Sequence, residues 1–208
     1  MQTAIDQFIN KHLPVLPIVT VHSASDIIPI IYALSKGGIN AIEITLRTDE
    51  GLKALELARL EMPNLFLCAG SVSSKKQVVQ AAEIGADLII SPGISRGIIE
   101  ESKRHHISLL PGISTPSDIL LGLEYNLQYF KLFPAEPLGG IDYLNSIASP
   151  FPDIQFCPTG GINKQNYQHY LNLKKVAFVG GSWLLKEEYI NEKNWAAIEE
   201  GTKELLIN

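Results

Sequence analysis

The chain has 208 residues, of which 46% are hydrophobic and 19% are charged, and its formal net charge at pH 7 is -5. That length fits one domain with a sizeable core, and an acidic chain without a basic patch or stripe argues against a nucleic-acid-binding protein. Because the sequence has no apolar run of membrane-spanning length and its first residues lack a basic segment followed by an apolar core, we expect a cytoplasmic protein without a membrane span.

Runs typical of strands alternate with helical patterns along the whole sequence. The predicted strands are 15–20, 41–47, 65–69, 87–91, 107–110, 128–133, 154–157 and 176–179. Helical segments follow them, among them 25–37, 49–60 and 116–124, and two helices end near residues 84 and 105.

Strict alternation with short connections predicts a closed parallel (β/α)8 barrel, with residues 1–208 as one minimal domain that has an N-terminal helical extension and a C-terminal helix. An open doubly wound sheet is the alternative, but no Gly-x-Gly-x-x-Gly motif follows the first predicted strand. The low charged fraction is a compositional hint of subunit contacts.

Polar and glycine-rich residues gather at the carboxyl ends of the predicted strands. They are Glu43 and Arg47, Gly70-Ser71, Ser91-Pro92-Gly93, Lys131, Thr159-Gly160-Gly161, and Gly180-Gly181-Ser182. In a barrel the loops that follow the strands build the active site at this end. We therefore expect these residues to line one site.

Lys131 lies in the aromatic and aliphatic run 128–133, which ends at Pro134. Pro134 cannot donate a ladder hydrogen bond, so Lys131 is expected near the carboxyl end of a buried strand. Removing an ammonium group from water favours the neutral amine, which is a nucleophile toward carbonyl carbon. The alternative is a lysine that reaches the strand end and pairs with a carboxylate for structural reasons.

Glu43, Thr45 and Arg47 are spaced by two and are expected to share one strand face, which in a barrel is the inner one. The planar guanidinium of Arg47 suits a substrate carboxylate, and Glu43 is suited to transfer protons. The other possibility is an ion pair that only holds the barrel together.

Two glycine pairs end the seventh and eighth predicted strands: Gly160-Gly161 and Gly180-Gly181. In barrels the loops after these strands often bind phosphate through bare backbone N–H groups, and Ser182 could add a hydroxyl. The glycines could also serve only as tight corners.

Other chemistries are poorly supported by the sequence. None of the five histidines forms a ligand pair with an acidic residue at a strand end, and none is tied to a candidate serine nucleophile. Cys68 and Cys157 lie in apolar runs and are expected to be buried free thiols. We expect no metal.

Seven ordered motifs resemble the class I aldolases for 2-keto-3-deoxy-6-phosphogluconate (KDPG), many of which also cleave 4-hydroxy-2-oxoglutarate (KHG). The motifs are 42–48 (IEITLRT), 69–72 (AGSV), 91–93 (SPG), 110–116 (LPGISTP), 130–136 (FKLFPAE), 157–162 (CPTGGI) and 180–183 (GGSW). They run in register from about Pro14 to Trp183.

The resemblance implies a homotrimeric barrel, without a cofactor, that acts on a phosphorylated keto acid. It implies Lys131 as the Schiff-base residue and Glu43 as the general acid/base. The implied substrate-binding residues are Arg47, Ser71 and Thr159 at the pyruvyl carboxylate, Pro92 and Phe133 at the pocket wall, and the glycine corners with Gly160, Gly161, Gly181 and Ser182 at the phosphate. Ser71 departs from the threonine usual in the family, which retains the hydroxyl and loses a methyl contact.

Three alternatives stay open from the sequence. An aldolase for the galactonate-derived epimer would use a very similar site. A phosphate-binding barrel without catalysis would use Lys131 only as a cation. A metal-dependent aldolase would lose activity in chelator.

Overall fold

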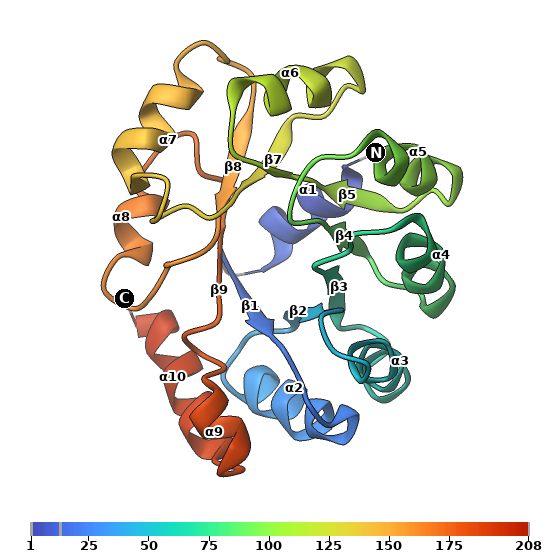
Figure 1. The fold of residues 1–208 in the computed structure, drawn as a ribbon. Helices are drawn as coiled ribbons and strands as arrows, with labels where there is room; N and C mark the ends of the chain where they lie inside the picture. Colours follow the sequence, from blue (N-terminus) through green and yellow to red (C-terminus); the bar gives the residue numbers. More distant parts are fainter. Residues whose placement is uncertain (1, 13, 208) are drawn as a thin grey trace.

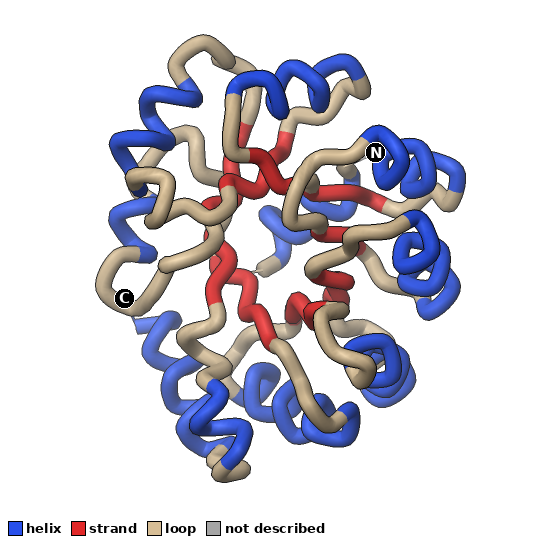
Figure 2. Tube along the Cα trace, viewed as in Figure 1, coloured by secondary structure: helices blue, strands red, loops and turns tan. Residues whose placement is uncertain are grey.

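The structure is a computed structural model that describes residues 2–12 and 14–207. It is an α/β fold in which parallel strands curl around a common centre and helices cover the outside (Figure 1). Figure 2 shows the strands as the inner layer, with the loops at one end facing the viewer. Within the described ranges no helix is long and apolar enough to cross a membrane.

The strands are β1 (Val15–Val19), β2 (Ala41–Thr45), β3 (Phe66–Gly70), β4 (Leu88–Ile90), β5 (Ser108–Leu110), β6 (Gly112–Ile113), β7 (Tyr129–Leu132), β8 (Gln155–Pro158) and β9 (Val179–Gly181). The helices are α1 (Thr3–Lys11), the 3-10 turn η1 (Ala24–Asp26), α2 (Ile27–Lys36), α3 (Gly51–Glu61), α4 (Lys75–Ile84), α5 (Arg96–Arg104), α6 (Pro116–Glu124), α7 (Gly140–Ala148), α8 (Tyr167–Leu171), α9 (Glu187–Asn191) and α10 (Trp195–Ile207).

The strands form two parallel sheets. The larger has the order β5-β4-β3-β2-β1-β9 and is curled into a half-barrel, and the smaller has the order β6-β7-β8. Isolated bridges between Phe156 and Val176 and between Thr159 and Gly180 bring β8 beside β9. All pairs between named strands are parallel, as expected when a helix crosses over between successive strands.

The predicted alternation is confirmed, although the strand bounds differ from the predicted ones in several places. The last strand begins at Val179 and not at Val176, because the Val176 N–H donates to the Leu173 carbonyl at 2.9 Å and closes a turn. An additional short strand, β6, follows β5 after Pro111, which cannot donate to a ladder. The Pro111 carbonyl accepts a hydrogen bond from the Lys131 N–H at 2.9 Å, so Pro111 lies beside β7.

Helix α1 packs against the amino ends of the strands. Its Phe8 side chain is 1% exposed, and its ring centroid lies 5.2 Å from that of Phe66 and 4.8 Å from that of Phe178. The side-chain amide of Gln2 donates to the Tyr129 carbonyl at 2.8 Å and to the Leu109 carbonyl at 3.1 Å. The predicted N-terminal helical extension therefore covers one end of the strands with apolar and hydrogen-bonded contacts.

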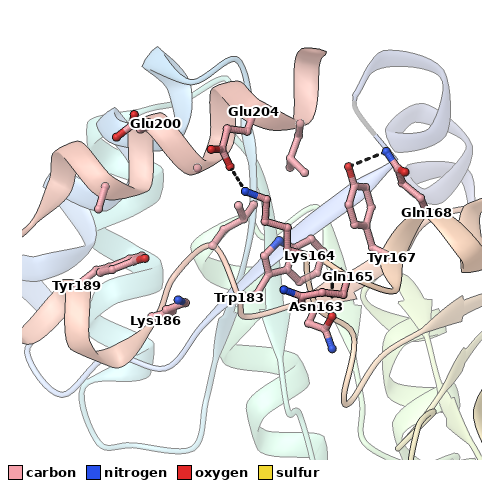
Figure 3. A pocket seen from close by; sticks show the side chains of 14 residues that line it. Asn163, Lys164, Gln165, Tyr167, Gln168, Trp183, Lys186, Tyr189, Glu200 and Glu204 are labelled. Carbon is pink, nitrogen blue, oxygen red and sulfur yellow. Dashed lines mark hydrogen bonds and ion pairs between the residues drawn. The ribbon is translucent and has the colours of Figure 1, made fainter. Parts of the chain in front are cut away.

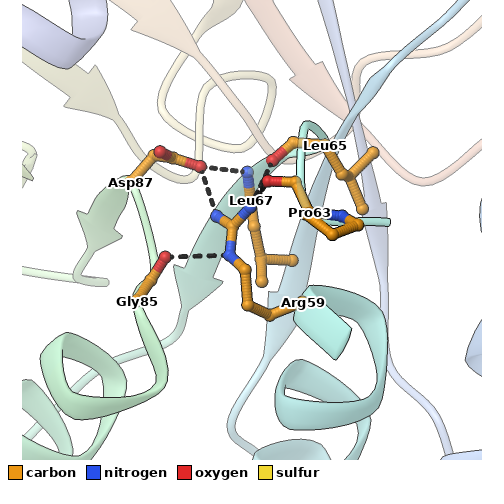
Figure 4. Close-up of polar contacts among 6 residues, drawn as sticks. All are labelled: Arg59, Pro63, Leu65, Leu67, Gly85 and Asp87. Carbon is orange, nitrogen blue, oxygen red and sulfur yellow. Dashed lines mark hydrogen bonds and ion pairs between the residues drawn. The ribbon is translucent and has the colours of Figure 1, made fainter. Parts of the chain in front are cut away.

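A hydrogen-bond network around Arg59 ties α3 to the starts of β3 and β4 (Figure 4). The guanidinium donates to the carbonyls of Pro63 at 2.6 Å, Leu65 at 3.1 Å and Gly85 at 3.1 Å, and to the Asp87 carboxylate at 2.7 Å. The same Asp87 oxygen accepts from the Leu67 N–H at 2.8 Å. One side chain thus satisfies three backbone carbonyls from two loops on the side of the strands away from the glycine corners.

We expect Arg59→Met to lower the free energy of unfolding by about 2 kcal/mol, because three carbonyls and a carboxylate lose their donor. Urea denaturation would measure it. Arg96→Met is the matched control, since Arg96 is 65% exposed and its pair with Glu124 at 3.2 Å is worth roughly 0–1 kcal/mol. Equal shifts of the two denaturation midpoints would contradict the role given to the network.

Candidate active site

A buried ion pair joins the two sheets. Lys131 in β7 is 4% exposed and Glu43 in β2 is 1% exposed, and the lysine Nζ lies 3.3 Å from the carboxylate Oε1. The Glu43 side chain occupies the space over Gly70, where an added Cβ would lie 2.4 Å from Oε1. A glycine at this position of β3 is therefore required for the carboxylate to reach the lysine.

Two thiols flank the ion pair in the strand register. Cys68 is the β3 partner of Glu43, and Cys157 is the β8 partner of Lys131. Both are buried free cysteines, as predicted. Burial raises the pKa of the Cys157 thiol to about 12 and also raises the pKa of Cys68, so both stay neutral beside the charged pair.

Arg47 lies beyond the end of β2 and is exposed, whereas Glu43 and Thr45 are buried. The expectation that all three share a strand face is wrong for Arg47, because the chain leaves the strand and enters a turn after Thr45. The Arg47 Nε donates to the Ser71 hydroxyl at 2.8 Å. Ser71 has a left-handed backbone (φ 56°) that directs the chain from β3 toward α4.

A cavity of about 600 Å³ opens at the carboxyl ends of β1, β2, β7, β8 and β9. Most of the predicted binding residues line it: Arg47, Phe133, Thr159, Gly160, Gly161, Gly181 and Ser182. Lys131 adjoins it, since its Nζ lies 5.4 Å from the centroid of the Phe133 ring. Ser71 does not line the cavity itself, but its hydroxyl accepts a hydrogen bond from Arg47, which does. Pro92 is exposed after β4 and does not line the cavity.

The two glycine pairs shape the cavity in different ways. Gly160 and Gly161 have φ of 94° and 84°, a conformation that favours glycine, and a Cβ on Gly161 would lie 2.5 Å from the Glu136 Cβ. Gly181 is needed for close packing, because a Cβ there would lie 2.0 Å from the Trp183 ring. Gly160, Gly161 and Gly181 all line the cavity.

Sequence reasoning missed the pair Tyr170 and Glu136, which supports the first corner. The Tyr170 hydroxyl donates to the Glu136 carboxylate. Burial, followed by this hydrogen bond, raises the pKa of Tyr170. The Ala135 and Glu136 N–H groups donate to the Thr159 carbonyl at 2.8 Å and the Gly160 carbonyl at 3.0 Å. The loop after β7 therefore binds the loop after β8. In the sequence, the acidic residue at the end of the 130–136 motif was the feature that could have indicated this contact.

His22 also lines the cavity. It is 70% exposed, and its Nε2 lies 4.0 Å from the Glu187 carboxylate. Among the residues that the structure describes, no group of three or more His, Cys, Asp or Glu side chains is placed to hold a metal ion.

A buried lysine beside a carboxylate, near the carboxyl ends of parallel strands and next to a glycine-lined cavity, is the arrangement that an aldolase-type carbon–carbon lyase requires. The family model for KDPG and KHG aldolase matches residues 5–201. The chain therefore belongs to the KDPG and KHG aldolase family.

Individual relatives agree over nearly the full chain. The 2-dehydro-3-deoxy-phosphogluconate aldolase of Dickeya dadantii is 39% identical over 99% of this chain and 96% of its own length. The KHG/KDPG aldolase of Escherichia coli K12 is 39% identical over 93% of this chain and 91% of its own length. The crystal structure of Legionella pneumophila KDPG aldolase, with pyruvate captured at low pH as a covalent carbinolamine intermediate, has a TM-score of 0.91 at 40% identity and covers 95% of this chain and 96% of its own.

We expect Gly161→Ala to reduce the affinity for phosphorylated ligands roughly tenfold or more, because the left-handed backbone and the Glu136 contact force the corner to move. Gly93→Ala is the control, since an added Cβ at Gly93 meets no atom within 4 Å. Isothermal titration with inorganic phosphate would measure both variants. Unchanged phosphate affinity in Gly161→Ala would exclude this corner from the phosphate site.

Proposed function

We propose that this chain cleaves 2-dehydro-3-deoxy-6-phosphogluconate to pyruvate and glyceraldehyde 3-phosphate, with Lys131 as the Schiff-base nucleophile. The observation that carries the proposal is the buried Lys131–Glu43 pair at 3.3 Å beside the glycine-lined cavity. The relative with pyruvate captured as a carbinolamine supports the same covalent chemistry, because a carbinolamine is the adduct that precedes an imine.

We infer that the two sheets make one closed (β/α)8 barrel in a single domain. The pairing of β9 with β1, the bridges between β8 and β9, and the passage from β5 into β6 across Pro111 support this inference. In such a barrel the loops at the carboxyl ends of the strands form the active site, which is where Lys131 and the cavity lie.

The first half of the mechanism forms an imine. Glu43, in contact with Nζ, takes a proton from the Lys131 ammonium group, and the freed amine attacks the 2-keto carbon. The proton on Glu43 and a second proton from the nitrogen, also carried by Glu43, pass to the former keto oxygen, while one proton stays on nitrogen. Water leaves, and the product is a protonated imine that carries a positive charge on nitrogen. Glu43 loses its contact with a free ammonium group and becomes available to the substrate.

The second half breaks the C3–C4 bond. Glu43, acting through a water molecule, removes the proton of the C4 hydroxyl, and the C4 oxygen forms the aldehyde carbonyl. The electron pair of the C3–C4 bond moves into the protonated imine and gives an enamine on Lys131. Protonation at C3 and hydrolysis of the resulting imine then release pyruvate and restore the amine.

Substrate binding follows the layout of the cavity. Arg47, with the hydroxyls of Ser71 and Thr159, would bind the pyruvyl carboxylate, and the guanidinium plane suits two parallel hydrogen bonds. Phe133 would shape the wall beside Lys131. The residues assigned to the phosphate end are Gly160, Gly161, Gly181 and Ser182. Pro92 is assigned to the pocket wall from the family resemblance alone.

Two finer assignments rest on the family resemblance: cleavage of 4-hydroxy-2-oxoglutarate to pyruvate and glyoxylate, and a homotrimeric assembly. The cytoplasmic location is a separate expectation from the sequence. The galactonate-derived epimer differs from the proposed substrate in stereochemistry at one carbon. Relative cleavage rates on the two epimers and on 4-hydroxy-2-oxoglutarate would rank the three substrates.

Lys131→Ala is expected to lower kcat/KM for cleavage by at least about a thousandfold, because Lys131 is the one buried lysine within residues 2–12 and 14–207. A coupled assay for pyruvate release would measure the loss. Lys53→Ala, which removes an exposed lysine paired with Glu50, is the control and should keep wild-type rates. Wild-type turnover by Lys131→Ala would end the Schiff-base assignment and favour a barrel that only binds phosphate.

Glu43→Gln is expected to slow cleavage by about two to four orders of magnitude, because the amide accepts no proton at neutral pH. Its shape preserves the fit over Gly70. Rapid-quench measurement of product formation in a single turnover would locate the effect in the chemical steps. An unchanged single-turnover rate would remove Glu43 from proton transfer.

A further inference from the structure

The cavity has a cation at its phosphate end that neither the glycine corners nor the motifs include. We propose that the ammonium group of Lys186 binds the substrate phosphate and makes this aldolase selective for phosphorylated substrates. The proposal rests on the function proposed above and adds a specificity-determining side chain to it. Lys186 lines the same cavity as Gly161, Gly181 and Ser182.

Among the described residues that line the cavity, Arg47 and Lys186 are the lysine and arginine side chains, and Glu187 is the carboxylate. The glycine corners offer backbone N–H groups, and Ser182 offers a hydroxyl, whereas a phosphate monoester carries a charge of about -1.5 to -2 near pH 7. Arg47 follows β2, whereas the corners follow β8 and β9, and β1 lies between β2 and β9 in the sheet. The guanidinium is also held by Ser71 at 2.8 Å. Lys186 is therefore the lining cation on the side of the glycine corners.

Lys186 is placed to supply that charge. It comes five residues after Gly181, and its backbone is extended (φ -60°, ψ 139°) just before α9. Its recorded contact is with the Tyr189 ring, whose centroid is 5.2 Å from Nζ. Within residues 2–12 and 14–207 its ammonium group has no hydrogen bond or ion pair, whereas Lys53, Lys164, Lys193 and Lys203 each pair with a carboxylate.

Lys186 lines two cavities, and the charged residues of each cavity indicate which of them suits an anion. Lys186 and Trp183 line both the substrate cavity and a second cavity of about 610 Å³. Figure 3 shows the second cavity, which α10 partly walls. Besides Lys186, the second cavity carries the carboxylates of Glu200 and Glu204 and one cation, Lys164, which pairs with Glu204 at 2.5 Å. The substrate cavity carries one carboxylate, Glu187, which is 77% exposed and faces His22 at 4.0 Å, and one further cation, Arg47. The substrate cavity is therefore the less acidic of the two, and it is the one that the glycine corners line.

The test compares Lys186→Gln with wild type on 2-dehydro-3-deoxy-6-phosphogluconate and on the same sugar acid without the phosphate. We expect the KM for the phosphorylated substrate to rise about tenfold, with kcat within about twofold, because a charge-assisted contact is lost from binding and the reacting carbons are untouched. The kcat/KM for the unphosphorylated substrate should not change. The inhibition constant of inorganic phosphate should rise with the KM.

Two variants serve as controls. Lys186→Arg keeps the charge and should restore the KM to within about threefold of wild type. Lys203→Gln removes the same charge from α10, where the lysine pairs with Glu199 outside both cavities, and should leave both substrates unchanged. Equal losses on the two substrates, or no change on either, would overturn the role of Lys186. A wild-type enzyme that cleaves neither substrate would instead contradict the proposed function.

Discussion

The site depends on one contact, the ion pair between Lys131 and Glu43, which places two charged side chains where less than a twentieth of either residue is exposed. Removing both groups from water costs several kcal/mol per ion, and their attraction offsets that cost only in part. Such a pair therefore contributes little to the stability of the fold. It suits a reaction, because it keeps a proton acceptor, Glu43, next to a proton donor, Lys131.

The surrounding strands make this contact possible. β2 and β7 belong to different sheets, so the pair connects the two halves of the strand layer. The bare Cα of Gly70 admits the carboxylate, and the neutral thiols of Cys68 and Cys157 occupy the neighbouring register positions. The opposite end of the strands is covered by α1 and tied by the Arg59 network, so stability and chemistry are concentrated at different ends.

Much of this arrangement is predictable from the sequence, because it follows from periodicity. Apolar runs of strand length and the residues at their carboxyl ends located Lys131, Glu43 and the glycine corners. The turn that removes Arg47 from the β2 face was not predictable, since it depends on how the chain turns toward α3 after Thr45. Tyr170 with Glu136, and Lys186, were missed because their roles come from neighbours far apart along the chain or from a shared cavity wall.

The most direct test of the account is reductive trapping with pyruvate and borohydride, followed by peptide mass mapping. Once its proton has passed to Glu43, the Lys131 amine forms an imine with a keto acid, and borohydride fixes this imine as a stable secondary amine. The account predicts one pyruvate-derived adduct per chain, on the peptide that contains Lys131, and none without pyruvate. An adduct confined to a different lysine, or no adduct in an enzyme that still cleaves its substrate, would contradict it.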